Sequence, residues 1–265
     1  MVSTLEQIDA WPSPHAAAGV RHPDGSITTH GPTSQRFALA SITKLFTAVA
    51  ALVAVEEGTL DLHQPDAEGV AVADLLAHSS GLDLAGNRVA APGRRRLYSN
   101  GAYEAVADRL AASAEMPFVT YLNEAVFGPL GMQATTLEGS PAHGGVSTVT
   151  DLLAFANGLD RLLAPETLSL MTTPHLPELT GVLPGYGRQE PNPWGLGPEI
   201  RSHKEPHWTG TSNSPFTWGH FGQAGTFLWV DPLANTTLVV LTDLPFGDWA
   251  KPVWPALSDA VLAGR

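Results

Sequence analysis

The sequence has 265 residues, of which 43% are apolar, and a formal net charge of −12. This length and apolar content are enough for a sizeable hydrophobic core, but there is no uncharged apolar run of about 18 residues that would predict a membrane span. The negative charge argues against a nucleic-acid partner, and the absence of cysteine excludes disulfides, thiolate catalysis and Cys-ligated zinc.

The N-terminal segment predicts a cytoplasmic chain that begins with a β-hairpin. Residues 1–9 do not contain the basic stretch and following apolar stretch of an export signal. Residues 15–20 are small and apolar, Pro23-Asp24-Gly25 is typical of a turn, and residues 26–29 favour a strand. We therefore expect two strands before the first long helix.

A largely buried helix is expected over residues 41–58. Its apolar positions are Leu45, Val49, Leu52, Val53 and Val55. Unpaired N–H groups at a helix start stabilise an oxygen that gains negative charge, which makes Ser41 a candidate nucleophile. Lys44 lies one turn later and can take the serine proton if burial lowers its pKa. An ordinary N-cap serine followed by a solvent-reaching lysine has the same pattern.

Residues 60–172 predict a mostly helical region. Helices are expected at residues 71–78, 101–112, 117–127, 149–163 and 165–171. The loop before the second of these contains the only basic cluster, Arg94-Arg95-Arg96, which we interpret as solvated.

Tyr98-Ser99-Asn100 follows this basic cluster and precedes a predicted helix. A phenol beside a lysine ammonium has a lowered pKa and can exchange a proton with a serine hydroxyl. The Asn100 amide is suited to hold Lys44 or a substrate carbonyl. A simple Ser/Asn helix cap is the alternative interpretation.

The C-terminal third predicts a cover segment followed by strands. Residues 174–198 are rich in Pro and Gly with little regular pattern, which indicates a functional loop or cover. Strands are expected at residues 217–219, 225–230 and 236–242, followed by a helix at 249–262. Three glycines within residues 219–225 indicate that a backbone or ligand approaches closely, and free N–H groups of an edge strand can complete an oxyanion hole.

Strands at both ends of the chain around a helical middle predict an α+β fold. We expect an antiparallel β-sheet flanked by helices, with an inserted all-helical lobe. The predicted sheet lobe comprises residues 1–59 and 173–265, and the helical lobe comprises residues 60–172.

Three short motifs follow one another along the chain: Ser41-x-x-Lys44, Tyr98-x-Asn100 and His220-x-Gly222. Their order and spacing resemble those of the serine β-lactamase and penicillin-binding-protein superfamily. More closely, they resemble the branch of class C β-lactamases, D-alanyl-D-alanine peptidases and esterases. Supporting phrases lie along most of the chain, among them Leu75-Leu76-Ala77-His78-Ser79-Ser80-Gly81-Leu82 and Trp194-Gly195-Leu196-Gly197.

The resemblance implies a role for each matching residue. Ser41 would be the acylated nucleophile, and Lys44 with Tyr98 the general-base pair. The backbone N–H groups of Ser41 and Gln223 would form the oxyanion hole. The residues implied to line the substrate site are Asn100, His220, Phe221 and Gly222. The implied chemistry requires neither a metal nor an organic cofactor.

The third motif departs from its penicillin-recognising relatives. There it is commonly Lys-Thr-Gly, whose charge and hydroxyl hold the substrate carboxylate, whereas here His220 is mostly neutral near pH 7 and Phe221 is apolar. We therefore expect a serine hydrolase that acts on a small-molecule ester or amide. A β-lactamase or D-alanyl-D-alanine carboxypeptidase is the alternative, and a non-catalytic member that binds a ligand or a partner is the alternative from another class.

Two other kinds of site find little support. An α/β-hydrolase is disfavoured because the sequence has no Gly-x-Ser-x-Gly. His203 and His207 have the spacing of a zinc helix, but Pro206 breaks that helix. We expect one or two of four tryptophans to line an apolar pocket: Trp194, Trp208, Trp218 and Trp229.

Overall fold

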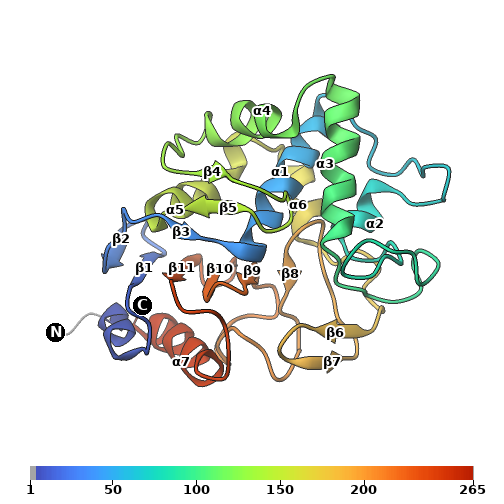
Figure 1. The fold of residues 1–265 in the computed structure, drawn as a ribbon. Helices are drawn as coiled ribbons and strands as arrows, with labels where there is room; N and C mark the ends of the chain where they lie inside the picture. The colour runs from blue at the N-terminus through green and yellow to red at the C-terminus, as the bar shows by residue number, and fades with distance from the viewer. Residues whose placement is uncertain (1–3, 265) are drawn as a thin grey trace.

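The computed structural model describes residues 4–264, so residues 1–3 and 265, at the two ends of the predicted sheet lobe, lie outside the described part. An antiparallel sheet crosses the molecule with helices on both faces (Figure 1), which confirms the predicted fold class. In chain order its strands are β1 (Ala16–Arg21), β2 (Ile27–His30), β8 (Glu199–Ile200), β9 (Trp218–Gly222), β10 (Thr226–Asp231) and β11 (Thr236–Thr242).

The sheet joins the two ends of the chain. Its strand order is β2-β1-β11-β10-β9-β8, and Val20 of β1 pairs with Leu238 of β11. The strands predicted from both termini therefore form one sheet, and β9 with its glycines lies next to the short edge strand β8.

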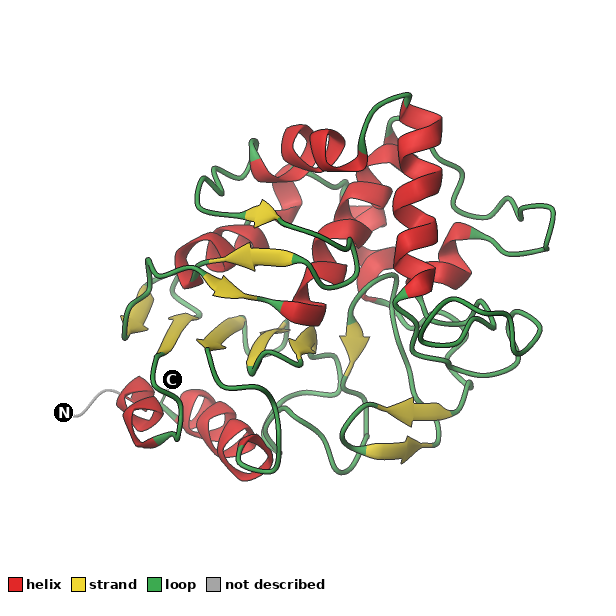
Figure 2. Ribbon diagram, in the orientation of Figure 1, coloured by secondary structure: helices red, strands yellow, loops and turns green. Residues whose placement is uncertain are grey.

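Helices cover the two faces of the sheet. The C-terminal helix α7 (Ala250–Ala263) and the N-terminal 3-10 helix η1 (Thr4–Ala10) pack on one face, below the strands in Figure 2. Trp254 of α7 is fully buried there, and Trp229 of β10 donates a hydrogen bond to Ser258 Oγ at 3.1 Å. Helix α5 (Val149–Asn157) packs on β1 and β11 from the other face.

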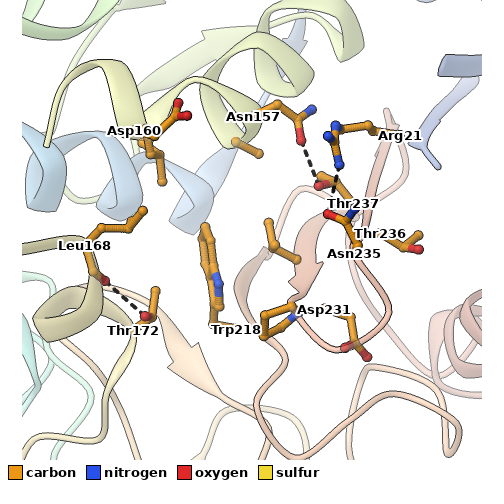
Figure 3. Close-up of a pocket in the computed structure, with 14 residues that line it drawn as sticks. Arg21, Asn157, Asp160, Leu168, Thr172, Trp218, Asp231, Asn235, Thr236 and Thr237 are labelled. Carbon is orange, nitrogen blue, oxygen red and sulfur yellow. Dashed lines mark hydrogen bonds between the residues drawn. The ribbon is translucent and has the colours of Figure 1, made fainter. Parts of the chain in front are cut away.

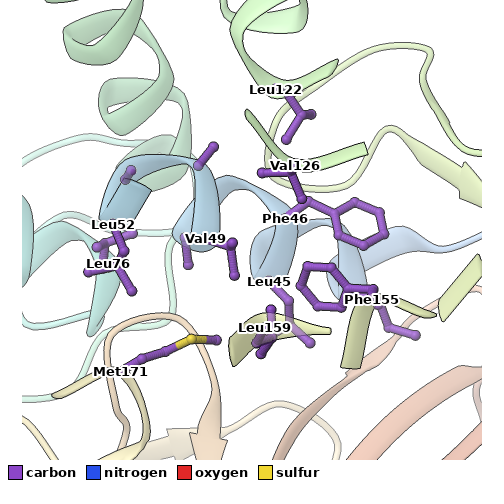
Figure 4. Packing of buried hydrophobic residues seen from close by; sticks show 14 of the residues in the cluster. Leu45, Phe46, Val49, Leu52, Leu76, Leu122, Val126, Phe155, Leu159 and Met171 are labelled. Atoms are coloured by element: carbon purple, nitrogen blue, oxygen red, sulfur yellow. The ribbon is translucent and has the colours of Figure 1, made fainter. Parts of the chain in front are cut away.

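The mostly helical region surrounds α1 (Thr43–Glu56), which is buried over nearly its whole length. Phe46 of α1 contacts Phe155 edge-on, with ring centroids 4.9 Å apart (Figure 4). It also contacts Phe127 edge-on, with ring centroids 5.1 Å apart. The surrounding helices are α2 (Val72–Leu76), α3 (Gly101–Ala114), α4 (Phe118–Leu122), η3 (Asn123–Phe127), η4 (Leu159–Arg161) and α6 (Pro165–Thr172). Among residues 4–264, no helix has both the length and the apolar character needed to cross a bilayer.

Three predicted segments differ from the observed elements. The helix expected over 149–163 ends at Asn157, because Gly158 interrupts it before the 3-10 turn η4. Residues 117–127 form α4 followed by the π-turn η3. The region also contributes the short strands β4 (Thr136–Leu137) and β5 (Gly145–Ser147), which pair in a small sheet with β3 (Phe37–Ala38).

Residues 174–198 are more regular than predicted. They contain a hairpin of β6 (Gly181–Leu183) and β7 (Gly187–Gln189), which the Pro/Gly-rich composition obscured. Gly185 has φ of 78° in the turn between these strands, a conformation that glycine adopts without strain.

The interpretation of Arg94-Arg95-Arg96 as solvated is wrong for Arg96, which is 2% exposed. Its guanidinium donates to the backbone oxygens of Ala77, His175, Leu176 and Asn192 at 2.6 to 3.0 Å. Burial lowers its pKa to about 10, so it stays charged at neutral pH. Arg96 therefore ties the loop before Tyr98 to the segment 174–198.

Removing the hydrogen bonds of the Arg96 side chain is expected to destabilise the protein. Arg96→Met removes the guanidinium donor from the carbonyl oxygens of Ala77, His175 and Asn192, whereas Leu176 O still accepts from Leu179 N. We therefore expect the free energy of unfolding to fall by about 3 kcal/mol or more. Urea unfolding followed by tryptophan fluorescence measures this change. The matched control Arg94→Met, at an exposed neighbour, is expected to stay within about 0.5 kcal/mol of wild type. Equal losses in the two variants would contradict the structural role.

Candidate active site

Ser41 lies in a sharp turn between β3 and α1. The short 3-10 helix η2 (Ala40–Ile42) precedes α1, so Ser41 lies two residues before the first residue of the α-helix rather than at its start. Ala40 has φ of 47°, a left-handed conformation that costs about 1 kcal/mol or more in a residue other than glycine. Thr43 stabilises this turn, because its hydroxyl donates to Ala40 O at 2.6 Å and accepts from Gly145 N at 2.9 Å.

The Lys44 amine is fully buried and lies 3.4 Å from Ser41 Oγ. It also donates to Asn100 Oδ1 at 2.7 Å and to Ala142 O at 2.9 Å. Burial lowers the pKa of Lys44 to about 7, although the Glu104 carboxylate opposes this change. A substantial fraction of the amine is therefore neutral at physiological pH.

The two carbonyl partners orient this neutral amine. A neutral amine has two N–H donors and one lone pair. If the donors go to Asn100 and Ala142, the lone pair is left for the Ser41 hydroxyl. Asn100 was expected to hold either Lys44 or a substrate carbonyl, and the structure shows the contact with Lys44. The role of the Ala142 carbonyl had no sequence signal, because any residue supplies a backbone oxygen.

Tyr98 lies on the other side of Ser41. Its hydroxyl donates to Ser41 Oγ at 2.7 Å, and Lys44 Nζ is 4.8 Å from the centre of its ring. The prediction that Lys44 lowers the pKa of Tyr98 is wrong, because burial raises that pKa above its usual value. Tyr98 is therefore a protonated hydrogen-bond donor to Ser41 in the resting protein.

The end of β9 approaches the Ser41 turn closely. A Cβ atom on Gly222 would be 2.1 Å from Leu39 O, so only glycine fits against this backbone. Thr226 adds a hydrogen bond to the same carbonyl oxygen at 2.9 Å. The close approach that the glycines predicted is thus between two backbones, and Gln223, the residue after Gly222, lines the same cavity as Ser41.

A cavity of about 290 Å³ opens at Ser41. The residues lining it are Ser41, Leu84, Tyr98, Asn100, Leu183, Pro184, Trp194, His220, Phe221 and Gln223. Of the residues predicted for the site, Lys44 lies behind Ser41 and Gly222 packs against Leu39 instead of lining the cavity. Leu183 and Pro184 come from the 174–198 segment, which was expected to cover the site.

Comparison with known proteins shows the family of this chain. The beta-lactamase family model matches residues 13–262. The chain belongs to the beta-lactamase family. A crystal structure of a beta-lactamase from Mycobacterium bovis is 50% identical, with a TM-score of 0.96 over 99% of each chain. A search of curated proteins found no match.

More distant structures share the fold of this beta-lactamase-family protein. Simvastatin synthase from Aspergillus terreus is 17% identical, with a TM-score of 0.79 over 98% of this chain and 96% of that one. EstCE1, described as a hydrolase with promiscuous acyltransferase activity, is 18% identical, with a TM-score of 0.77 over the same fractions.

His220 gives this family member a neutral third motif. Its Nδ1–H donates to Phe221 O at 2.6 Å, which leaves Nε2 as an acceptor. Burial, reinforced by the nearby Lys44 charge, lowers the pKa of His220 to about 3. The expectation from sequence that this position is mostly neutral near pH 7 is confirmed.

His78 is a site residue that the motif analysis did not single out. Its ring packs on Tyr98 with centroids 4.6 Å apart, and its Nδ1 accepts from Ser99 N at 3.1 Å. His78 has φ of 56°, so the turn after α2 directs the ring inward. His78 is part of the family-like phrase at residues 75–82, which was the only sequence signal for it. Its packing against Tyr98 is visible only in the folded structure.

A buried charged network lies behind Trp194, the one predicted tryptophan that lines the Ser41 cavity. Glu199 accepts from Lys204 Nζ at 2.6 Å and from Trp208 Nε1 at 2.6 Å, and His207 Nε2 lies 3.0 Å away. Burial alone raises the pKa of Glu199, but Lys204 and His207 more than offset this and hold the pKa below its usual value. Lys204 Nζ is 5.7 Å from the centre of the Trp194 ring.

A separate cavity of about 380 Å³ lies between α5, α6 and the ends of β10 and β11 (Figure 3). Trp218 lines it, but none of the three motifs does. Its polar side chains pair with each other: Asn157 Oδ1 accepts from Thr237 at 3.0 Å, and Asn235 Oδ1 accepts from Arg21 at 3.1 Å. The Ser41 cavity is therefore the candidate active site.

The contact between Gly222 and Leu39 leads to a prediction. Gly222→Ala forces β9 away from the Ser41 turn, so we expect the free energy of unfolding to fall by about 1–3 kcal/mol in urea titrations. Gly139→Ala is the matched control, because its Cβ would meet only an ordinary contact at 3.9 Å. An unfolding midpoint of Gly222→Ala equal to that of the control would argue against the close approach.

Proposed function

We propose that this protein is a serine hydrolase that forms an acyl-enzyme on Ser41 and acts on esters or small amides. One observation carries the proposal: Ser41 Oγ accepts a hydrogen bond from Tyr98 at 2.7 Å and lies 3.4 Å from Lys44 Nζ, at the wall of a cavity. A hydroxyl between a buried amine and a buried phenol has both a proton acceptor and a proton donor within reach.

Acylation begins with the neutral amine of Lys44. As Ser41 Oγ bonds to the substrate carbonyl carbon, its proton passes to Lys44. The backbone N–H groups of Ser41 and Gln223 are the proposed donors to the resulting oxyanion. The bond to the leaving oxygen or nitrogen then breaks, and that atom takes a proton from Tyr98, which Lys44 reprotonates. Water releases the acyl group by the same transfers in reverse.

The cavity supports an ester or small amide better than a β-lactam. The carboxylate of a penicillin or a D-alanyl-D-alanine peptide needs a cationic or hydroxyl partner. The described residues that line the cavity include no Lys or Arg, and both His220 and Phe221 are uncharged there. The 50% identical structure from Mycobacterium bovis is described as a beta-lactamase, which makes β-lactam hydrolysis the second candidate.

Mass spectrometry of the intact protein tests the acyl-enzyme. We expect brief incubation with p-nitrophenyl acetate to add one acetyl group to wild type and none to Ser41→Ala, because only the serine hydroxyl is activated. A penicillin, tested in parallel, would add its own mass if β-lactams are the substrates. Equal labelling of the two variants would place the reaction elsewhere, and no labelling or turnover by either compound would favour a non-catalytic binding protein.

The pH dependence of activity tests the role of Lys44. Because the neutral amine is the active form, kcat/KM for p-nitrophenyl acetate is expected to rise with pH around an apparent pKa of about 7. Glu104→Gln removes the carboxylate that raises this pKa, so the rise should move to lower pH. Asp108→Asn, at an exposed position one turn later on α3, is the control and should leave the profile in place. An unshifted profile in Glu104→Gln would contradict the assignment.

A further inference from the structure

An open groove of about 450 Å³ lies beside the Ser41 cavity. The two hollows share Leu84, Tyr98 and Pro184 as lining residues, so the groove continues from the cavity past the phenol that contacts Ser41. Its size alone falls in the range of small-molecule binding sites.

Hydrogen bonds between distant segments fix both walls of the groove. On one wall, Leu84 O accepts from Asn100 N at 3.0 Å, which ties Leu84 to the start of α3. On the other, the β6–β7 hairpin is joined to the loop before Tyr98, because Arg96 N donates to Thr180 O at 2.8 Å. The buried Arg96 guanidinium reinforces this second connection. The groove is therefore part of the folded framework.

The surface of the groove is mainly apolar. Leu84 and Val182 line it and are 56% and 59% exposed. These are large exposed fractions for residues with aliphatic side chains, whose transfer out of water is favourable. Leu97 and Pro184 extend the same surface. A ligand with an aliphatic segment would remove this apolar area from water.

Arg95 and Arg188 line the groove but not the Ser41 cavity, so the cationic part lies away from the nucleophile. Arg188 pairs with Glu190 at the surface, whereas Arg95 is exposed and has no ion pair to any residue within 4–264. No carboxylate of the described chain lines the groove, although the whole chain has a net charge of −12. This local positive charge complements an anion.

We propose that the groove binds an aliphatic arm of the substrate that ends in an anionic group such as a carboxylate. The proposal rests on the proposed acyl transfer at Ser41, because the arm is attached to the reacting ester. The acyl part and the alcohol part of an ester can each carry such an arm, and the same chemistry would recognise both.

Two ester series test the proposal and separate the two parts of the ester. The first varies the acyl group: p-nitrophenyl acetate, p-nitrophenyl octanoate and mono-p-nitrophenyl octanedioate. The second keeps the acetyl group and varies the alcohol: ethanol, octanol and 8-hydroxyoctanoic acid. In at least one series we expect kcat/KM to rise about tenfold with the aliphatic arm and about threefold more with the carboxylate. Equal values for all arms in both series would overturn the proposal.

Matched variants locate the effect on the groove. Arg95→Glu is expected to lower kcat/KM for the carboxylate-ended ester at least about threefold and to leave the acetyl ester within about twofold. Arg94→Glu makes the same charge change at an exposed neighbour that does not line the groove, and should have little effect. Val182→Asp should reduce the preference for the octyl arm, whereas Val119→Asp, at an exposed position of α4, should not. The same loss in Arg94→Glu as in Arg95→Glu would overturn the assignment.

Binding to Ser41→Ala separates this proposal from the proposed function. If wild type turns over none of the esters, the hydrolase proposal fails, but the binding of 1-octanol and of octanoate to Ser41→Ala can still be compared by calorimetry, since only octanoate ends in a carboxylate. Tighter binding of octanoate that is lost in Ser41→Ala/Arg95→Glu would support the groove. No binding, or binding independent of Arg95, would overturn it.

Discussion

Burial of the Lys44 amine is the constraint on which the candidate site depends. An ammonium group loses solvation in a protein interior, so its neutral form becomes accessible near pH 7. Such a group also needs hydrogen-bond partners, and Asn100 and Ala142 supply them from two different segments. The same packing of α1 that desolvates Lys44 therefore determines where its lone pair is directed.

The fold meets this constraint by bringing four segments together. The left-handed Ala40 turns Ser41 toward the cavity, and Gly222 allows β9 to lie against the carbonyl of Leu39. Tyr98 arrives from the loop before α3, with its ring packed on His78. Each of these contacts joins residues far apart in the chain, so the geometry at Ser41 depends on the whole core.

Buried charged residues also stabilise the 174–198 segment, which forms the wall of the cavity that faces Ser41. Arg96 joins the loop before Tyr98 to residues 175–192 through backbone oxygens, and Glu199 with Lys204 supports Trp194 from behind. Buried charges of this kind are costly unless every partner is present. They make the 174–198 segment an ordered wall of the cavity despite its high content of Pro and Gly.

The sequence by itself determined the α+β class, most strands and helices, and the three ordered motifs that indicate the family, because periodicity and motif spacing are local properties of the chain. It also indicated a neutral group at His220. Tertiary structure alone decided that Arg96 is buried, that Tyr98 keeps its proton, and that Ala142 and His78 support the site. It also decided that a largely apolar groove lined by Arg95 and Arg188 adjoins the Ser41 cavity. These properties depend on desolvation and on contacts between distant segments, and neither is encoded in any short stretch of residues.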